Sequence, residues 1–259
     1  MASASLKADD LEAYRGLARL CEEGSAEVYY ETDAYADYLK LAGIRETHLC
    51  KIEMAELDQL HLAPPLEKRL RVAILGAYRE EKGPLRLPSI GLKYNQLARA
   101  EGLPAIEYVI HTPDVAGSGE RYKKLIKSLQ RDQIDHHYSE GSGLDNGYLE
   151  HLRASHVVLF PYDPEVYKAR GPGAGCDAVA NGRIVVSQGD CAVREYVRGG
   201  NGLTAMSDED FANALLGVAS DYERFAQKAF REAQAFRAAL ENHPLFARLN
   251  GLRDQQPAA

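Results

Sequence analysis

A glycine-rich loop near the middle of the chain has the composition of an anion-binding site. Residues 157–160 are apolar and Pro161 ends the run, as expected for a buried parallel strand. Three glycines then surround the start of a predicted helix, at positions Gly171, Gly173 and Gly175. The backbone N–H groups of a helix start lack intrahelical partners, and glycines let the oxygens of an anion approach them closely. Arg170 adds a planar cation suited to phosphate, so a diphosphate is the expected ligand.

A second cationic turn follows the first strand of the predicted sheet. Residues 72–75 are apolar and lead into Gly76-Ala-Tyr-Arg-Glu-Glu-Lys-Gly83. In an open parallel sheet, ligands bind outside the carboxyl ends of the strands. Arg79 and Lys82 are therefore expected over the same crevice as the glycine-rich loop, where they would add positive charge for a diphosphate. Two glutamates are equally close, so a solvated charged turn is the alternative interpretation.

Strands and helices alternate from residue 71 onward. Strands are predicted at residues 72–75, 106–111, 135–138, 157–162, 184–187 and 203–205, and helices at 85–101, 119–131, 144–154, 173–180 and 192–197. This alternation predicts an α/β fold, a Rossmann-like doubly wound, mainly parallel sheet with helices on both faces. A long helix is predicted from residue 207 or 208 to 240, followed by a polar, frayed tail.

The first 65 residues carry fewer elements. Helices are predicted at about 9–23 and 32–42, and short strands at 26–30 and 47–52. This is too little material for a separate domain of usual size. The chain is therefore divided into a partial N-terminal α/β segment (1–65), a Rossmann-like domain (66–241) and a C-terminal tail (242–259).

Composition narrows the class of protein. The chain has 259 residues, of which 45% are hydrophobic, so it can bury a sizeable core. A net charge of −7 argues against a general nucleic-acid partner. The sequence has no apolar run long enough to be a transmembrane segment, no apolar signal core at its start, and four cysteines without a metal or disulfide spacing. The expected localisation is cytoplasmic.

The histidines do not predict a metal site. His111 ends a predicted strand at the ligand edge, where it either contacts a nucleotide base or is structural. His136 and His137 stand beside Asp135 and invite a zinc interpretation, but adjacent strand residues point to opposite faces and the spacing matches no compact zinc motif. The P-loop, dinucleotide and serine-hydrolase motifs are absent as well.

Three pieces of the sequence, in this order and spacing, resemble the C-terminal, nucleotide-sugar-binding domain of GT-B glycosyltransferases of the large retaining group. They are the turn at 75–83, the strand Ala-Ser-His-Val-Val-Leu-Phe-Pro-Tyr at 154–162 with the glycine-rich loop behind it, and Arg-Glu-Tyr-Val-Arg-Gly-Gly-Asn-Gly-Leu at 194–203. The resemblance spans residues 71 to about 239. The loop also resembles a subgroup with Tyr-x-x-Arg-x-Ser-Gly, here Tyr167 to Gly173 with Pro172 in place of serine.

The resemblance implies roles for individual residues. Arg79 and Lys82 would bind the donor diphosphate and act in catalysis by stabilising its charge. Asp177 corresponds to a glutamate that holds the ribose hydroxyls, whereas Ala169 stands where the group has a glutamate near the sugar. Glu195 matches the glutamate of the third piece, with a helix-capping role as the alternative. The other implied donor-binding residues are Gly76, Gly83, His111, Tyr162, Tyr167, Arg170, Gly171 and Gly173.

The implied function is that of a glycosyltransferase donor domain. It would bind a UDP- or GDP-linked sugar and transfer the glycosyl group, with retention, to an acceptor hydroxyl on a glycan, lipid or protein. Catalysis would be electrostatic, without a metal or other cofactor. Complete GT-B enzymes have two Rossmann-like domains with the acceptor between them, and residues 1–65 resemble only the last elements of the first. A missing acceptor domain, in the same or another chain, is therefore expected.

Two other functions stay open. One is a non-catalytic or degenerate nucleotide-sugar-binding module, which Ala169 and the short N-terminal segment favour. The other is a GT-B-type sugar-nucleotide epimerase, which the same phosphate-binding loops would serve. Transfer or hydrolysis of a donor distinguishes the glycosyltransferase from the binding module. Isomerisation of a donor without an acceptor identifies the epimerase.

Overall fold

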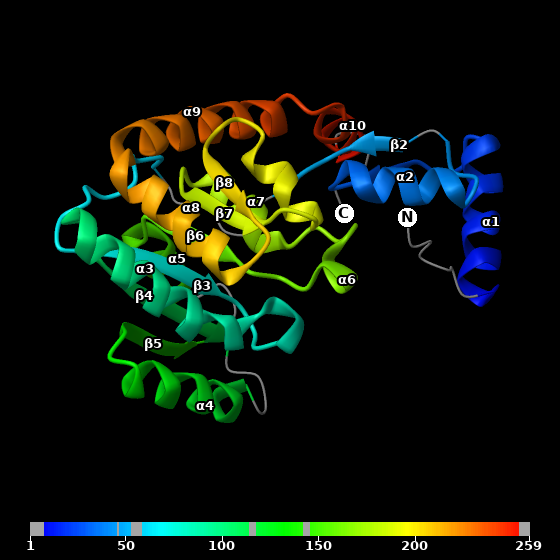
Figure 1. Ribbon diagram of the computed structural model, residues 1–259. Coiled ribbons are helices and arrows are strands. Elements are labelled where there is room, and N and C mark those ends of the chain that lie inside the picture. The colour runs from blue at the N-terminus through cyan, green and yellow to red at the C-terminus, as the bar shows by residue number, and fades with distance from the viewer. Residues whose placement is uncertain (1–7, 46, 53–58, 114–117, 142–145, 254–259) are drawn as a thin grey trace.

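A six-stranded parallel sheet forms the centre of the computed structural model, which describes residues 8–45, 47–52, 59–113, 118–141 and 146–253 (Figure 1). The strand order is β5-β4-β3-β6-β7-β8, and every neighbouring pair is parallel. The strands are β3 (Arg69–Leu75), β4 (Ala105–Pro113), β5 (Asp135–Gly141), β6 (Val157–Phe160), β7 (Ile184–Gln188) and β8 (Gly202–Ala205). The predicted Rossmann-like α/β sheet is confirmed.

The order of the strands reverses between β3 and β6. From β3 the chain moves outward to β4 and β5, returns to β6 on the other side of β3, and continues outward to β7 and β8. The β3–β6 pair is joined at Val72↔Val157 and Ala73↔Val158. Ligands of doubly wound sheets bind in the crevice at the carboxyl ends of the two strands beside such a reversal. Here those ends lie at Leu75 and Phe160.

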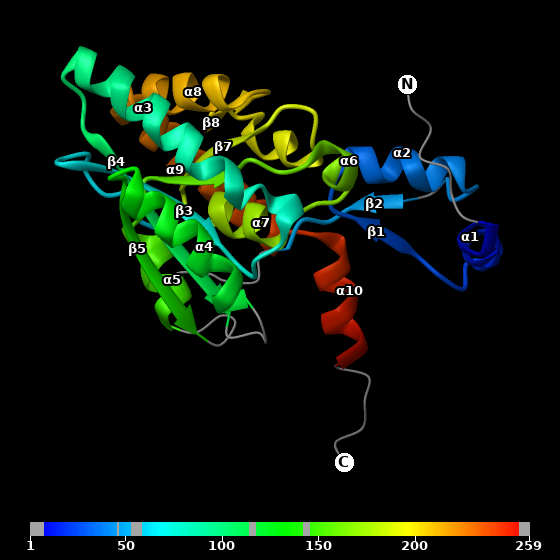
Figure 2. The same ribbon diagram turned by 60° about the horizontal axis from the view of Figure 1, so that its bottom comes forward.

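Helices cover both faces of the sheet (Figures 1 and 2). Val72 and Ile74 of β3 join one apolar core with α3, α4, α8 and α9, whereas Ala73 and Leu75 point into a second core with α5 and α7. Because central strands are buried on both sides, their sequences are apolar without interruption. The helices are α3 (Leu87–Glu101), α4 (Ser118–Arg131), α5 (Asn146–Ala154), α7 (Gly173–Ala180), α8 (Asp208–Ser220) and α9 (Tyr222–Glu241).

Three elements differ from the sequence-based predictions. The long helix predicted from residue 207 to 240 is two helices, α8 and α9, because Asp221 between them has a non-helical backbone with φ −129° and ψ 42°. The helix predicted at 192–197 is a 3₁₀ helix, η3 (Ala192–Val197). The tail is not frayed throughout, since Pro244–Arg253 forms α10.

The N-terminal segment has its own small sheet. It contains α1 (Ala8–Glu22), β1 (Val28–Tyr30), α2 (Asp33–Leu41) and β2 (Thr47–Leu49), and β1 pairs with β2 in parallel, apart from the large sheet. The C-terminal helices return to this segment (Figures 1 and 2). His243 hydrogen-bonds the carbonyl oxygen of Leu49 at 2.8 Å, and Arg248 on α10 forms an ion pair with Glu27. The C-terminal part of the described chain thus packs against the region of β1 and β2.

No helix within the described ranges combines the length and the apolar character that crossing a membrane requires.

Candidate functional site

The loops that follow β3 and β6 touch each other at the point where the strand order reverses. A Cβ atom on Gly83 would lie 2.1 Å from the carbonyl oxygen of Pro161, and Gly83 has a φ of 68°. Both facts require glycine, which has no Cβ and adopts positive φ without strain. The backbone N–H of Asp163 also donates to the carbonyl oxygen of Glu81 at 2.8 Å. The two loops predicted to share a crevice are therefore in direct contact.

This contact places Lys82 over the carboxyl end of β3. Residues 80–82 form a single 3₁₀ turn, η1 (Glu80–Lys82), between an extended Arg79 and Gly83. The side chain of Lys82 folds back, and its Nζ atom is 3.0 Å from where a Cβ on Gly76 would stand. Gly76 ends the strand and donates its N–H to the carbonyl oxygen of His111 at 2.9 Å.

Arg79, Lys82 and Arg170, called here the cation cluster, come together from the two loops. Burial first, and then the positive charges of Arg79 and Arg170, lower the pKa of Lys82 to about 8, with Glu81 acting in the opposite direction. Arg79 and Arg170 are exposed, and Lys82 is half-buried. Bringing three like charges together is unfavourable in the absence of an anion. A lowered lysine pKa with nearby cations at a ligand edge is typical of a functional site.

Two buried tyrosines form the floor of the cation cluster. Tyr162 and Tyr167 pack with ring centroids 4.3 Å apart, and the guanidinium of Arg170 lies 5.6 Å from the centroid of Tyr167. Burial raises the pKa of Tyr167, and the positive charges of Arg170 and Arg79 partly offset this rise. The short helix α6 (Pro164–Tyr167), which sequence analysis did not predict, positions Tyr167; its signal is Asp163-Pro164, an N-cap residue followed by a first-turn proline.

The glycine-rich loop leads directly into α7. Its N-cap residue is Pro172, whose side chain makes no capping hydrogen bond to the helix start at Gly173. The backbone N–H groups of the first turn are therefore suited to an anion. Gly171 lies against the N-terminal segment, since a Cβ there would stand 2.7 Å from Oε2 of Glu31. The loop thus borders both parts of the chain.

Asp177 and His111, which are predicted to contact the ligand, are both buried in the structure. Asp177 is 2% exposed and accepts a hydrogen bond from the Tyr148 hydroxyl at 2.6 Å. His111 is 1% exposed, and its Nδ1 hydrogen-bonds the Ser139 hydroxyl at 2.9 Å. That hydroxyl also lies 2.6 Å from Nε2 of His151. Contacts of Asp177 with ribose and of His111 with a base stay predictions.

The histidine pair that invited a zinc interpretation is part of β5. His136 hydrogen-bonds the carbonyl oxygen of Ile134 through Nδ1 at 2.9 Å. Across the described ranges, no three histidine, cysteine or acidic side chains gather in a way that could hold a metal ion.

Glu195 connects the two parts of the chain. It is 5% exposed, and its carboxylate accepts hydrogen bonds from the backbone N–H groups of Asp33 at 2.8 Å and Ala34 at 3.1 Å, at the start of α2. Beside it, Thr32 donates its hydroxyl to the carbonyl oxygen of Ala169 at 2.8 Å, and Arg198 pairs with Asp33 at 2.5 Å. Glu195 thus caps the start of α2, a helix that lies far from it in the sequence, which agrees with the capping alternative. A ligand contact for this residue stays a prediction.

We expect Glu195→Gln to loosen α2 from the large domain. The substitution keeps the shape but removes the charge that faces two N–H groups and the positive end of a helix dipole, a loss of about 1–2 kcal/mol. Hydrogen–deuterium exchange of a peptide covering residues 30–41 should become roughly tenfold faster, with the melting of the large sheet unchanged. Glu223→Gln, in the first turn of α9, is the matched control. Equal exchange in both variants would contradict the docking role.

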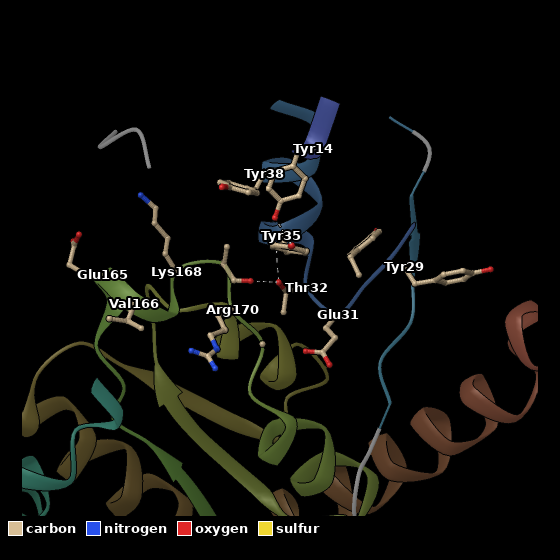
Figure 3. A pocket seen from close by; sticks show the side chains of 13 residues that line it. Tyr14, Tyr29, Glu31, Thr32, Tyr35, Tyr38, Glu165, Val166, Lys168 and Arg170 are labelled. Atoms are coloured by element: carbon tan, nitrogen blue, oxygen red, sulfur yellow. Dashed lines mark hydrogen bonds between the residues drawn. The ribbon is translucent and has the colours of Figure 1, made fainter. Parts of the chain in front are cut away.

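A cavity of about 700 Å³ opens between the N-terminal segment and the loop after β6 (Figure 3). Sequence analysis did not predict it, because its aromatic residues lie on three separate elements that meet only in the folded chain. Its lining consists of Tyr14, Tyr29, Tyr30, Glu31, Thr32, Tyr35, Tyr38, Glu165, Val166, Lys168, Ala169, Arg170 and Gly171. Arg170 belongs to this lining and to the cation cluster, so the two features are adjacent.

Comparison with known proteins finds the fold but no relative in sequence. No family profile and no curated protein matches the chain. The sucrose-phosphate synthase of Thermosynechococcus elongatus has a TM-score of 0.66 at 15% identity, over 97% of this chain and 64% of that one. Anabaena HepE, solved with UDP and glucose, has a TM-score of 0.61 at 15% identity, over 93% of this chain and 67% of that one. A UDP-forming trehalose-phosphate synthase from Burkholderia xenovorans has a TM-score of 0.59 at 14% identity, over 95% of this chain and 63% of that one.

These likenesses cover nearly all of this chain but only about two thirds of the length of each of these three proteins. The doubly wound parallel sheet agrees with the resemblance found in the sequence. The chain therefore has the fold of the GT-B glycosyltransferases, with its six-stranded sheet in the place of their C-terminal domain.

Proposed function

We propose that the chain binds a nucleoside-diphosphate sugar at the cation cluster and acts as the donor-binding part of a glycosyltransferase. One observation carries this proposal: Arg79, Lys82 and Arg170 converge at the crevice beside the strand reversal, with the pKa of Lys82 lowered to about 8. The start of α7, where the N-cap residue Pro172 makes no side-chain capping bond, lies at the end of the loop that carries Arg170. A diphosphate supplies the negative charge that these groups lack.

UDP is the first nucleotide to test. HepE was solved with UDP and glucose, and the trehalose-phosphate synthase is UDP-forming. We propose that UDP binds in preference to GDP and ADP. Calorimetric titration of the three diphosphates should show one selective ligand. If a folded protein binds none of them, the donor-site proposal is wrong.

In the proposed reaction, the bond between the anomeric carbon and the β-phosphate oxygen breaks. Negative charge then grows on the departing diphosphate, and the cation cluster with the N–H groups of α7 stabilises it. The acceptor hydroxyl approaches from the side of the N-terminal segment, and its proton passes to the departing diphosphate oxygen as the new bond forms. We propose transfer with retention, as the resemblance implies. The anomeric configuration of the product, read by NMR, tests this point.

Ala169 favours a second candidate, a module that binds the donor without transferring it. The GT-B group carries a sugar-binding glutamate at this position, and here the side chain is a methyl group. Release of UDP from a UDP-sugar in the presence of acceptors distinguishes the two candidates. Binding without release over prolonged incubation would support the module.

Binding of UDP-glucose is expected to weaken as the pH rises above 8. The pKa of Lys82 is about 8 in the unliganded protein, and a bound diphosphate raises it because the protonated form gains a partner. Binding therefore takes up a proton above pH 8, and affinity falls by up to about tenfold per pH unit there. Calorimetry in two buffers of different ionisation enthalpy measures the number of protons that are taken up when UDP-glucose binds. No proton uptake between pH 8 and 9 would contradict a diphosphate contact with Lys82.

A further inference from the structure

The helices α4, α3 and α8 form one face of the molecule, which we call the three-helix face. They lie on the same side of the large sheet, and α3 packs against both of the others (Figures 1 and 2). Each helix follows a strand end, since α3 comes after β3, α4 after β4 and α8 after β8. Because these strands are parallel, the three helices begin at the same edge of the sheet and run in the same direction.

One side of the three-helix face is strongly basic. Within α4, five lysine and arginine residues accompany a single acidic residue, Glu120, although the whole chain has a net charge of −7. Three of the cations, Arg121, Lys124 and Lys127, recur every three residues, so they share one broad side of the helix, and all three are exposed. The apolar side of α4 is buried in the core, so the basic side is what this helix offers to a partner.

The opposite side of the three-helix face is acidic. The helix α8 contains no lysine or arginine and has three acidic residues in its first turn. Beside it, a groove of about 510 Å³ opens between the loops after β3, β6, β7 and β8. Arg86 connects the two, because it lines the groove and pairs with Asp208 at 2.7 Å. The acidic side chains of this side, which we call the acidic edge, are Asp208, Glu209, Asp210, Glu80, Asp163 and Asp190.

Exposed apolar side chains lie between the basic and the acidic side. Leu85, in the 3₁₀ turn η2 (Pro84–Arg86) that leads into α3, is 64% exposed, and Leu92 on α3 is 40% exposed. The seven residues between them correspond to two helical turns, so both side chains fall on one stripe of α3. Met206, which lines the groove with Leu85, is 57% exposed. An apolar centre with charged flanks is typical of a protein–protein interface.

A second copy of the chain carries the charges that complement this face. A two-fold axis parallel to α3 would place α4 of each copy against the acidic edge of the other, and α3 against α3. The starts of α4 and α8 would then lie at the same end, which brings Lys124 close to Glu209 of the other copy. An axis across the helices would instead place α4 against α4, where like charges repel. An anionic surface is a poorer partner, because the acidic edge belongs to the same face.

We propose that the chain forms a two-fold symmetric dimer through the three-helix face, with Leu85 and Leu92 at its centre and α4 of each copy against the acidic edge of the other. This inference does not depend on the proposed function. Dimerisation is measurable without any nucleotide, so either can fail without the other.

Sedimentation velocity of the whole chain over a range of concentrations tests the dimer. We expect a monomer–dimer equilibrium with a Kd on the order of 10 µM at low salt. Raising the salt from about 50 to about 500 mM should weaken it roughly tenfold, because salt screens the pairs at the rim.

A charge exchange tests the pairing of α4 with the acidic edge. Lys124→Glu and Glu209→Lys should each weaken the dimer about tenfold, since each reverses a charge at two symmetric places. Both side chains are exposed, and the ion pair of Glu209 with Lys93 is long, at 3.8 Å, so folding should not suffer. An equimolar mixture of the two variants should dimerise as wild type does, because every reversed charge then meets its opposite. Loss of stability in either variant would not produce this recovery.

Leu92→Glu tests the centre of the interface. It places two carboxylates opposite each other near the two-fold axis and should leave a monomer at all concentrations. Leu41→Glu, on α2 outside the three-helix face, is the matched control, because Leu41 is 81% exposed. We expect that variant to dimerise as wild type does.

Four results would overturn the proposal: a monomer throughout in the wild type, a species larger than a dimer, full dimerisation of Leu92→Glu, or a mixture of charge variants that stays monomeric. Vesicles containing phosphatidylglycerol provide a second test. A monomeric wild type that sediments with these vesicles, while Lys124→Glu does not, would assign α4 to an anionic surface and overturn the dimer as well.

Discussion

Replacing Lys82 with methionine is expected to weaken UDP binding by about 1.5–3 kcal/mol, or roughly ten- to 150-fold, which is the range for hydrogen bonds to charged groups. Methionine fills nearly the same volume but carries no charge. Arg79 and Arg170 stay in place, so binding is weakened and not abolished. Calorimetric titration of wild type and variant at pH 7 gives the difference directly.

The same substitution is expected to raise the free energy of unfolding of the unliganded protein. The pKa of Lys82 is about 8 in the folded chain and near 10.5 in a solvated lysine. The unfolded state therefore binds the proton more tightly, and the charge on Lys82 destabilises the fold. This cost is complete below pH 8 and disappears as the pH rises towards 10.5. Methionine removes it, so stability at pH 7 should increase while binding decreases.

Opposite signs for stability and binding distinguish a ligand-binding lysine from a merely structural one. Lys93→Met is the matched control, because Lys93 lies on α3 and pairs with Glu209 at 3.8 Å, outside the cation cluster. We expect that variant to bind UDP as wild type does. If Lys82→Met loses stability, or binds UDP with full affinity, the assignment of Lys82 to the diphosphate is wrong.

The sheet could be predicted from the sequence because the signal is local. Central parallel strands are buried on both faces, so each appears as an apolar run, and the order of runs and helical segments predicts a doubly wound sheet. The break between α8 and α9 was not predictable in the same way. Both helices have apolar stripes at helical spacing, and Asp221 between them is a residue that helix interiors tolerate.

The cationic part of the site could also be predicted from the sequence. Arg79, Lys82 and Arg170 follow strand ends, and topology brings strand ends together. The contacts between segments that are far apart in the sequence could not be predicted. Nothing local in the sequence indicates that Glu195 caps a helix 162 residues earlier, or that Tyr14 meets Tyr35. Such contacts follow from how the N-terminal segment packs, which no single periodicity encodes.

The second large effect concerns Gly83. Replacing it with alanine is expected to cost about 3–5 kcal/mol of unfolding free energy, because two penalties combine. The backbone has a φ of 68°, which side chains other than glycine rarely adopt, and the new Cβ would stand 2.1 Å from the carbonyl oxygen of Pro161. That oxygen cannot move freely, since it accepts a hydrogen bond from Arg86, whose guanidinium also holds Asp208 and Gln188.

Gly102 isolates the contact from the backbone strain. It has the same φ of 68° at the end of α3, and a Cβ there would meet nothing within 4 Å. Gly102→Ala should therefore cost about 1–2 kcal/mol, the price of the left-handed conformation alone. Denaturant unfolding of both variants gives the difference, which we expect to be about 2–3 kcal/mol. Equal losses would show that the loops after β3 and β6 can separate without cost. The close approach of Gly83 to Pro161 would then not be what holds Lys82 and Arg170 in one site.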